Sequence, residues 1–138
     1  MKKILTLLGL LVGSMGFAQD NVVAAPSAFD TTFSRVEVEA SFPGGLSAWS
    51  AFLSQNLRSN VPIRKKAPAG TYNVIVQFIV DKTGLVTDIK SLTNHGYGME
   101  EEVVRVIRRS PRWSPARQNG RMVKAYRQQP LTFVVEGK

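Results

Sequence analysis

The chain contains no cysteine and only one histidine, His95. The absence of cysteine excludes disulfides, thiolate zinc sites, cysteine nucleophiles and lipid attachment through a cysteine. One imidazole, without a second one or a close pair of carboxylates, cannot build a metal site or a general base with its orienting partner. We therefore expect His95 to lie in a loop, and we expect no metal, no cofactor and no enzymatic activity.

A hydrophobic run long enough to cross a bilayer is also missing. The apolar stretch at 4–17 follows Lys2 and Lys3, and it is shorter than the roughly 20 residues of a membrane-spanning helix. Gly16 and Ala18 are small residues of the kind that precede a signal peptidase cut. Retention of this leader as an inner-membrane anchor is the less favoured alternative. We predict three segments, namely a signal peptide at 1–18, a flexible lead-in at 19–34 and one exported, periplasmic domain at 35–138.

Two glycine motifs lack residues that catalysis or phosphate binding would need. Residues 45–49 resemble a serine nucleophile elbow, but Trp49 stands where that motif requires glycine. Residues 96–98 lie where a dinucleotide phosphate loop would lie, but Glu101 replaces its third glycine. Three successive glutamates would also repel a phosphate. We interpret Glu100 to Glu102 as a solvated first helical turn that complements the helix dipole.

The spacing of apolar residues predicts the secondary structure. Alternation indicates a short strand at 35–41, and three- and four-residue steps indicate a helix over 46–57 that ends by Pro62. The large aromatic residues Phe42, Trp49 and Trp113 are expected in the core. The later elements are a central strand at 72–80, a turn at 81–84, a strand at 85–92, a helix from Gly98 to before Pro111, a type I′ turn at Asn119-Gly120, and strands at 122–127 and 131–135. This order predicts a two-layer α+β fold, with an antiparallel sheet of about three to four strands and two helices on one face.

Basic residues dominate the last third of a chain whose net charge is +8. The segment 103–135 contains no acidic residue. Its basic residues form a candidate basic patch: Arg105, Arg108, Arg109, Arg112, Arg117, Arg121, Lys124 and Arg127. An exported protein seldom meets nucleic acid, and the segment lacks interleaved aromatic residues, so we expect no nucleic acid. Cell-wall polymer, anionic lipid or an acidic partner segment fits such a patch better, and a merely solvated basic face is the alternative.

Several motifs in register resemble the TonB C-terminal domain, especially its Bacteroidetes forms. They run in unbroken order from about Val36 to Val135. The motifs are Phe42-Pro43-Gly44-Gly45, the strand into Asp81-Lys82-Thr83-Gly84, Ser110-Pro111-Arg112-Trp113-Ser114-Pro115, Gln118-Asn119-Gly120 and Gln129-Pro130-Leu131-Thr132-Phe133.

The resemblance implies a partner and a binding mode. Domains of that family bind the Ton box, an extended segment of outer-membrane transporters, by strand addition. This binding is linked to transmembrane transport. The strand that matches the capturing edge consists of Leu131, Thr132, Phe133, Val134 and Val135, whose backbone groups would bind the peptide. Val61 and Pro62 stand where many family members have a Tyr-Pro pair, so they are a candidate peptide contact.

Three functions remain open at this point. The first is a periplasmic Ton box binding domain that supplies no energy itself. The second is a membrane-anchored energy transducer, if the leader is retained. The third is a cell-wall or anionic-surface binder that uses the basic face. An edge strand also permits a homodimer.

Overall fold

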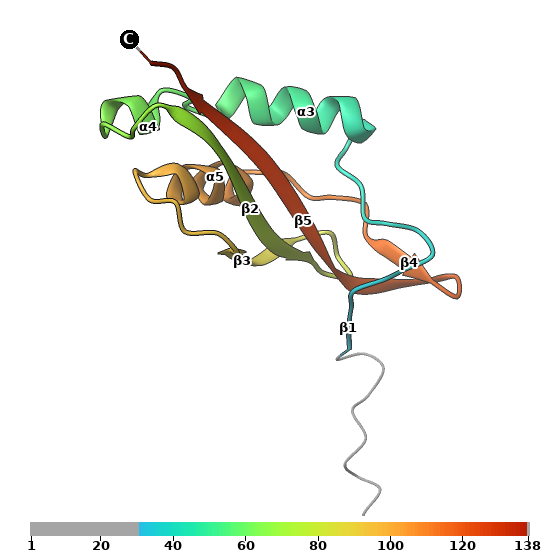
Figure 1. The fold of residues 1–138 in the computed structure, drawn as a ribbon. Helices are drawn as coiled ribbons and strands as arrows, with labels where there is room; N and C mark the ends of the chain where they lie inside the picture. Colours follow the sequence, from blue (N-terminus) through green and yellow to red (C-terminus); the bar gives the residue numbers. More distant parts are fainter. Residues whose placement is uncertain (1–30, 138) are drawn as a thin grey trace, which may run out of the picture. The chain divides into compact units, whose positions relative to one another are not determined.

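The computed structural model describes residues 31–137, and one compact unit begins at Thr32. The predicted signal peptide and residues 19–30 of the predicted lead-in therefore lie outside the described residues. The elements follow one another as β1 (Thr32–Phe33), α3 (Gly45–Asn56), α4 (Val61–Arg64), β2 (Gly70–Val80), β3 (Val86–Ser91), α5 (Met99–Arg108), β4 (Ala116–Gln118) and β5 (Arg121–Val135) (Figure 1).

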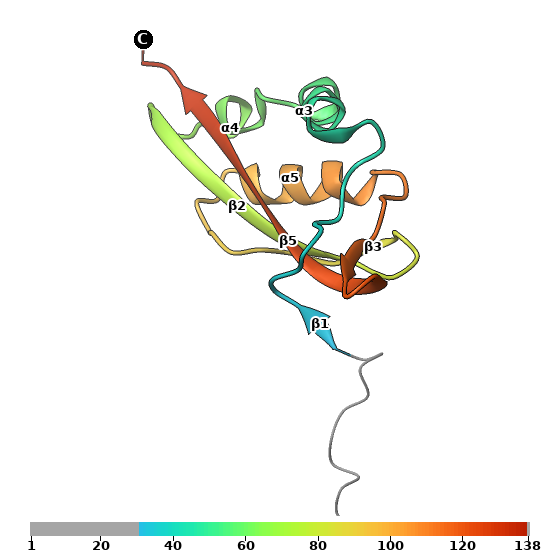
Figure 2. The ribbon, with the colours of Figure 1, turned by 90° about the vertical axis from the view of Figure 1, so that its right-hand side faces the viewer.

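The sheet confirms the predicted two-layer α+β fold. Its strand order is β1-β5-β2-β3, and β4 pairs with β5 beside this path. β2 and β5 are antiparallel over their long shared register, from Gly70 opposite Val135 to Val80 opposite Ala125. The helices cover one face of the sheet, as Figure 2 shows. The sheet is mixed rather than wholly antiparallel, because the short strand β1 runs parallel to β5.

The last two predicted strands are one continuous strand, so the prediction of a break near Pro130 is wrong. Pro130 lies inside β5 and pairs with Ile75 of β2. The N–H of Ile75 donates to Thr93 Oγ1 at 3.2 Å, and its carbonyl accepts from the Leu92 N–H at 2.8 Å, so both groups point away from β5. Paired residues in an antiparallel ladder either exchange both bonds or neither. A proline at this position therefore removes no bond between β2 and β5.

The predicted strand at 35–41 is also wrong. This segment makes only isolated bridges, Val38 with Arg117 and Ser41 with Ser114. Ala40 is buried as the alternation predicted, but Val38 is 53% exposed. The segment lies antiparallel to residues 114–117, but Pro115, which has no N–H, stands between the two bridges, so no continuous ladder forms. The strand of this region is β1, which lies within the predicted lead-in.

Two turns depend on glycine. Asn119 and Gly120 both have positive φ (54° and 75°), which is the requirement of the predicted type I′ turn between β4 and β5. Gly84, with φ of 90°, lies in the turn between β2 and β3. A Cβ on Gly84 would lie 2.0 Å from the Trp113 carbonyl oxygen, so only glycine fits there.

An aromatic cluster fills the space between the helices and the sheet. Trp49 of α3 packs against Phe42 and Trp113, with ring centroids 5.1 Å and 4.9 Å apart. Phe78 of β2 lies 5.4 Å from Trp113. These contacts confirm that Phe42, Trp49 and Trp113 are core residues. Across residues 31–137, no helix has the length and apolar character needed to span a bilayer.

Candidate functional site: the free edge of strand β5

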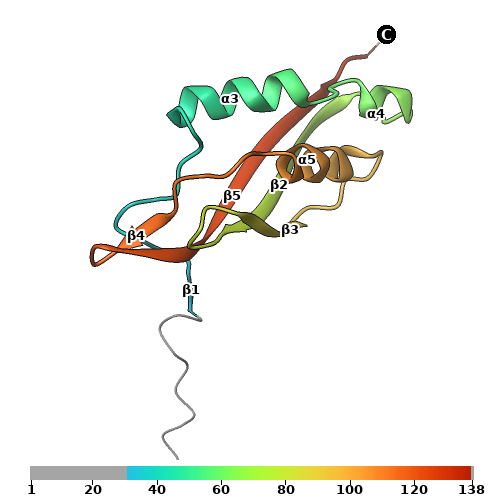
Figure 3. The same cartoon turned by 180° about the vertical axis from the view of Figure 1, so that it is seen from behind.

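β5 has one edge that is paired throughout and one that is mostly free. β2 pairs with residues 125–135, and β4 pairs with residues 121–123. The opposite edge is met only by β1, at Lys124 and Ala125. Within the described part of the chain, no strand pairs with this second edge from Tyr126 to Val135, which Figures 1 and 3 show as the outer side of the long ribbon.

The register fixes which backbone groups face outward. Because the backbone groups of Ile75 point away from β5, those of its partner Pro130 point away from β2. Successive residues of a strand direct these groups to opposite edges. The residues whose N–H and C=O groups face the free edge are therefore Tyr126, Gln128, Pro130, Thr132 and Val134.

Pro130 divides this free edge into two halves. It has no N–H, and its carbonyl accepts a hydrogen bond from Gln129 Nε2 at 2.7 Å. Gln129 is held in turn by Trp49, whose Nε1 donates to Gln129 Oε1 at 2.7 Å. The Tyr126 N–H faces β1, because the backbone groups of Ala125 face β2 and its parallel bridge with Phe33 is made through the residues on either side of it. The free donors are thus the amide of Gln128 in one half, and those of Thr132 and Val134 in the other.

The five residues of the predicted binding strand lie in the second half of this edge. Leu131, Phe133 and Val135 turn their backbone groups to β2 and their side chains to the helices, where Phe133 and Val135 are buried. Only Thr132 and Val134 present backbone groups outward. Tyr126 and Gln128 are not among the predicted binding residues, because the capturing strand was expected to begin at Leu131.

Val61 and Pro62 lie in α4 rather than on the edge itself. Pro62 is buried, and Val61 packs so closely on Gly98 that a Cβ there would lie 2.8 Å from Val61 Cγ1. Their neighbour Ile63 is 55% exposed and lines an open groove together with Val134, which is equally exposed. This groove lies where α4 approaches the end of β5.

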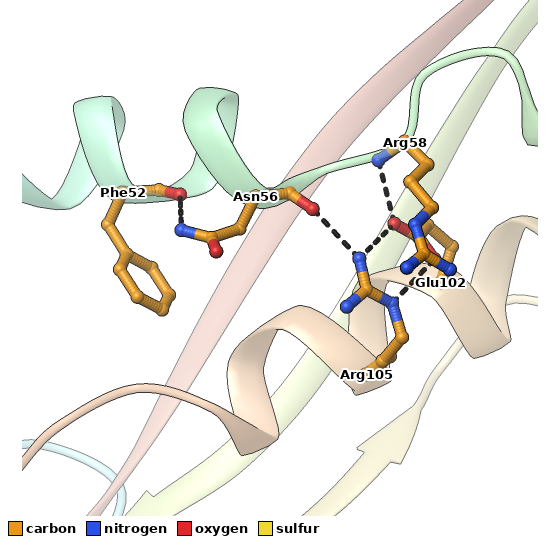
Figure 4. Close-up of polar contacts among 5 residues, drawn as sticks. All are labelled: Phe52, Asn56, Arg58, Glu102 and Arg105. Carbon is orange, nitrogen blue, oxygen red and sulfur yellow. Dashed lines mark hydrogen bonds and ion pairs between the residues drawn. The ribbon is translucent and has the colours of Figure 1, made fainter.

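The predicted basic patch is divided by internal contacts, the strongest of which involve Arg105. Its Nε and Nη2 donate to the two carboxylate oxygens of Glu102 at 2.9 and 2.7 Å. Nη2 also donates to the Asn56 carbonyl at 2.8 Å, and the Arg58 N–H donates to Glu102 at 2.7 Å (Figure 4). Arg105 therefore joins α5 to the end of α3.

The other basic residues are spread over several elements. The guanidinium of Arg112 donates to Thr83, that of Arg117 to the Gly120 carbonyl, and that of Arg127 to Glu39. The exposed members are Arg108, Arg109, Arg112, Arg117 and Arg121, and Lys124 is half-buried. The first two belong to α5 and its end, whereas Arg117, Arg121 and Lys124 belong to the β4–β5 hairpin.

The solvated first turn predicted at Glu100 to Glu102 is wrong for two of its three residues. Glu100 and Glu102 are buried, and only Glu101 is exposed. The Glu100 carboxylate accepts from the N–H groups of His95 and Gly96 and from the Thr93 hydroxyl, so it closes the loop before α5. Burial alone raises the pKa of each carboxyl, but these hydrogen bonds, and those of Arg105 and Arg58 to Glu102, hold both pKa values below the ordinary 4.5.

His95 lies in the loop between β3 and α5, as predicted. Its ring is exposed, with Nε2 2.9 Å from the Asn73 carbonyl oxygen and its edge against Tyr72. Among residues 31–137, no three histidine, cysteine, aspartate or glutamate side chains converge to hold a metal ion.

Comparison with known proteins supports the resemblance found in the sequence. The model of the family described as Gram-negative bacterial TonB protein C-terminal matches residues 66–135, half of the chain, from the end of α4 through β5. No curated protein matches the chain. Domains of the matching family are non-enzymatic interaction domains, in general periplasmic, that are linked to TonB-dependent transport. The chain belongs to the TonB C-terminal domain family.

Proposed function

We propose that this chain is a periplasmic binding domain that captures the Ton box segment of an outer-membrane transporter by strand addition at the free edge of β5. The observation that carries the proposal is the row of outward backbone groups from Tyr126 to Val134. A long, unpaired strand edge is a template for another chain, and proteins either protect it or use it. Because the chain belongs to the TonB C-terminal domain family, we expect the free edge of β5 to be used for binding.

Binding at this edge is divided into two short ladders. Thr132 and Val134 supply N–H and C=O groups to one half of the peptide, and Gln128, together with the Tyr126 carbonyl, supplies them to the other. A backbone hydrogen bond contributes a net ~0.5 to 1.5 kcal/mol, and ordering the peptide opposes it. We therefore expect weak, reversible capture, in which side-chain contacts such as the exposed Ile63 and Val134 add apolar area.

A proline substitution at Thr132 tests backbone pairing at the free edge of β5 directly. Thr132→Pro removes an outward amide and leaves the bonds to β2 intact, and Pro130 already occupies the equivalent position two residues earlier. We expect this variant to lose Ton box binding by about tenfold or more, whereas Thr132→Val, which keeps the amide, retains it. Equal peptide affinities for the two folded variants would contradict strand addition at this half of the edge.

Export is part of the same proposal. Residues 1–18 are proposed to act as a cleaved signal peptide, which leaves a periplasmic chain without its own membrane tether. Retention of the apolar stretch at 4–17 would instead make the chain a membrane-anchored energy transducer. The two versions differ in the mass of the protein found in the cell envelope, which intact-mass spectrometry determines.

A further inference from the structure

Arg127 lies at the first half of the free edge with an incompletely satisfied guanidinium. Its Nη1 pairs with Glu39 Oε1 at 3.3 Å, and its Cζ lies 5.7 Å from the centre of the Trp113 ring. Its Nε is buried and has no hydrogen-bond partner, the one such side-chain atom in the described part of the chain. A buried, charged donor without an acceptor is unfavourable, so this group favours any acceptor that reaches it.

The existing partner of Arg127 is loosely held. Glu39 contacts one nitrogen only, at a long distance, and its side chain is 56% exposed. An exposed ion pair of this kind contributes little, because water replaces the partner at small cost. A carboxylate that bonded Nε and a terminal nitrogen together would use the planar fork of the guanidinium, which is the stronger geometry.

Two hollows at the surface meet at Arg127. One is shared with Glu39, Tyr126 and Gln128, at the first half of the free edge. The other is apolar, with Leu46 and Trp49 among its walls, and Leu46 is 75% exposed. A side chain that enters between them meets apolar surface along its stem and a cation at its tip.

We propose that Arg127 recognises an acidic side chain in the segment that pairs with the edge of β5. This inference rests on the proposed strand addition, since the backbone groups of Tyr126 and Gln128 would hold that segment beside the guanidinium. Glu39 then serves as an internal stand-in that the incoming carboxylate displaces. The specificity of capture would lie in this one charge, and the backbone ladder would be tolerant of sequence.

The test uses the chain from Gln19 onward, which keeps the whole folded unit. The probes are synthetic peptides of about ten residues, the length of a long strand, built from Val and Thr. One series carries a single Glu at each position in turn, and the matched series carries Gln. Affinity is measured by calorimetry, and edge contact is followed by the amide signals of Gln128 and Thr132.

We expect one Glu position to bind about fivefold to tenfold more tightly than its Gln counterpart. This preference should disappear in Arg127→Met and persist in Arg121→Met, whose side chain is exposed in the hairpin. Arg127→Lys keeps the positive charge but lacks the planar guanidinium, so it should reduce the preference for Glu. This variant replaces Arg127→Met in the test if the latter fails to fold. Glu39→Ala, which removes the competing carboxylate, should raise the affinity for the Glu peptide.

The two proposals fail in different ways. Equal affinities for every Glu and Gln pair, with the edge amides still shifting, would overturn the role of Arg127 and leave strand addition standing. A Glu preference that survives in both Arg127 variants would also overturn it. Absence of binding by any peptide in either series, with no amide shift at the edge, would overturn both.

Discussion

Pro130 of β5 lies opposite Ile75 of β2, whose N–H and carbonyl are both engaged on the β3 side. This relationship explains how a proline is accommodated inside the longest strand of the sheet. It also fixes the direction of every backbone group along β5, and so identifies the outward amides. The same proline interrupts the free edge at its centre, which limits pairing between edges of two copies.

Neighbouring positions of β5 should differ in how much stability a proline costs. Phe133→Pro removes an N–H that faces β2 and a buried ring, so we expect a loss of at least ~3 kcal/mol in the free energy of unfolding. Thr132→Pro, whose amide faces outward, should lose less than about 1 kcal/mol. Urea unfolding of the two variants measures both values, and similar losses would contradict the assigned register.

The carboxylate of Glu102 should stabilise the fold, whereas that of Glu101 should have almost no effect on stability. Glu102→Gln weakens the contacts with Arg105 and Arg58, so we expect a loss of about 1 to 3 kcal/mol at neutral pH. Glu101→Gln is the matched control on the same turn, and its exposed side chain should give less than ~0.5 kcal/mol. Thermal or urea unfolding distinguishes the two, and equal effects would contradict the buried network of Figure 4.

The stability of the domain should fall at acidic pH because of Glu100 and Glu102 in the first turn of α5. The pKa values of Glu100 and Glu102 are lower in the folded chain than their ordinary value of 4.5. The unfolded chain therefore binds these protons first, so the stabilisation is full above about pH 5 and is lost as the pH falls through the lower, folded pKa values. The Glu102→Gln variant should show a shallower loss as the pH falls below about 5. An unchanged slope would contradict this assignment.

Gly84 and Gly96 provide a matched pair of turn glycines. Both have φ near 90°, but a Cβ on Gly84 would strike the Trp113 carbonyl, whereas one on Gly96 would meet nothing within 4 Å. Gly84→Ala should therefore destabilise the domain by roughly 3 kcal/mol or more, and Gly96→Ala by about 1 to 2 kcal/mol from backbone strain alone. Melting temperatures measure the difference, and the reverse order would be inconsistent with the turn described.

The length of the chain found in the cell envelope shows whether the leader at 1–18 is cleaved or is retained as a membrane anchor. We expect intact-mass spectrometry of the periplasmic fraction to find a chain that begins at Gln19, because Gly16 and Ala18 suit a signal peptidase. A full-length chain recovered from the inner membrane would contradict cleavage and favour the energy-transducer alternative.

The sequence predicted those elements whose patterns are local. The alternation in 72–80, the helix from Gly98 to before Pro111 and the Asn119-Gly120 turn all correspond to structure, because each depends on neighbouring residues only. β1 could not be predicted, since two residues become a strand only through their partner in β5. The burial of Glu102 likewise depends on the N–H of Arg58, which is distant in the sequence. That of Glu100 depends on how the loop directly before α5 turns its N–H groups toward the carboxylate.

The candidate site was predicted only in its second half. The alternation of Leu131, Phe133 and Val135 indicated a strand with one buried face, and the structure agrees. Which edge of that strand is free depends on the order of strands in the sheet, so it could not be derived from the pattern. The expected break near Pro130 also left Tyr126 and Gln128 out of the predicted binding edge and placed Arg127 in the basic patch only, although proline is tolerated at the edges of sheets.

The most direct test of the central claim is an amide titration of the labelled chain with a Ton box peptide. Strand addition predicts that the outward amides of Gln128, Thr132 and Val134 shift and become protected from exchange. The inward amides of Leu131 and Phe133, already bonded to β2, should change less. Saturating shifts confined to other surfaces, or no shift along β5 at millimolar peptide, would contradict capture at this edge.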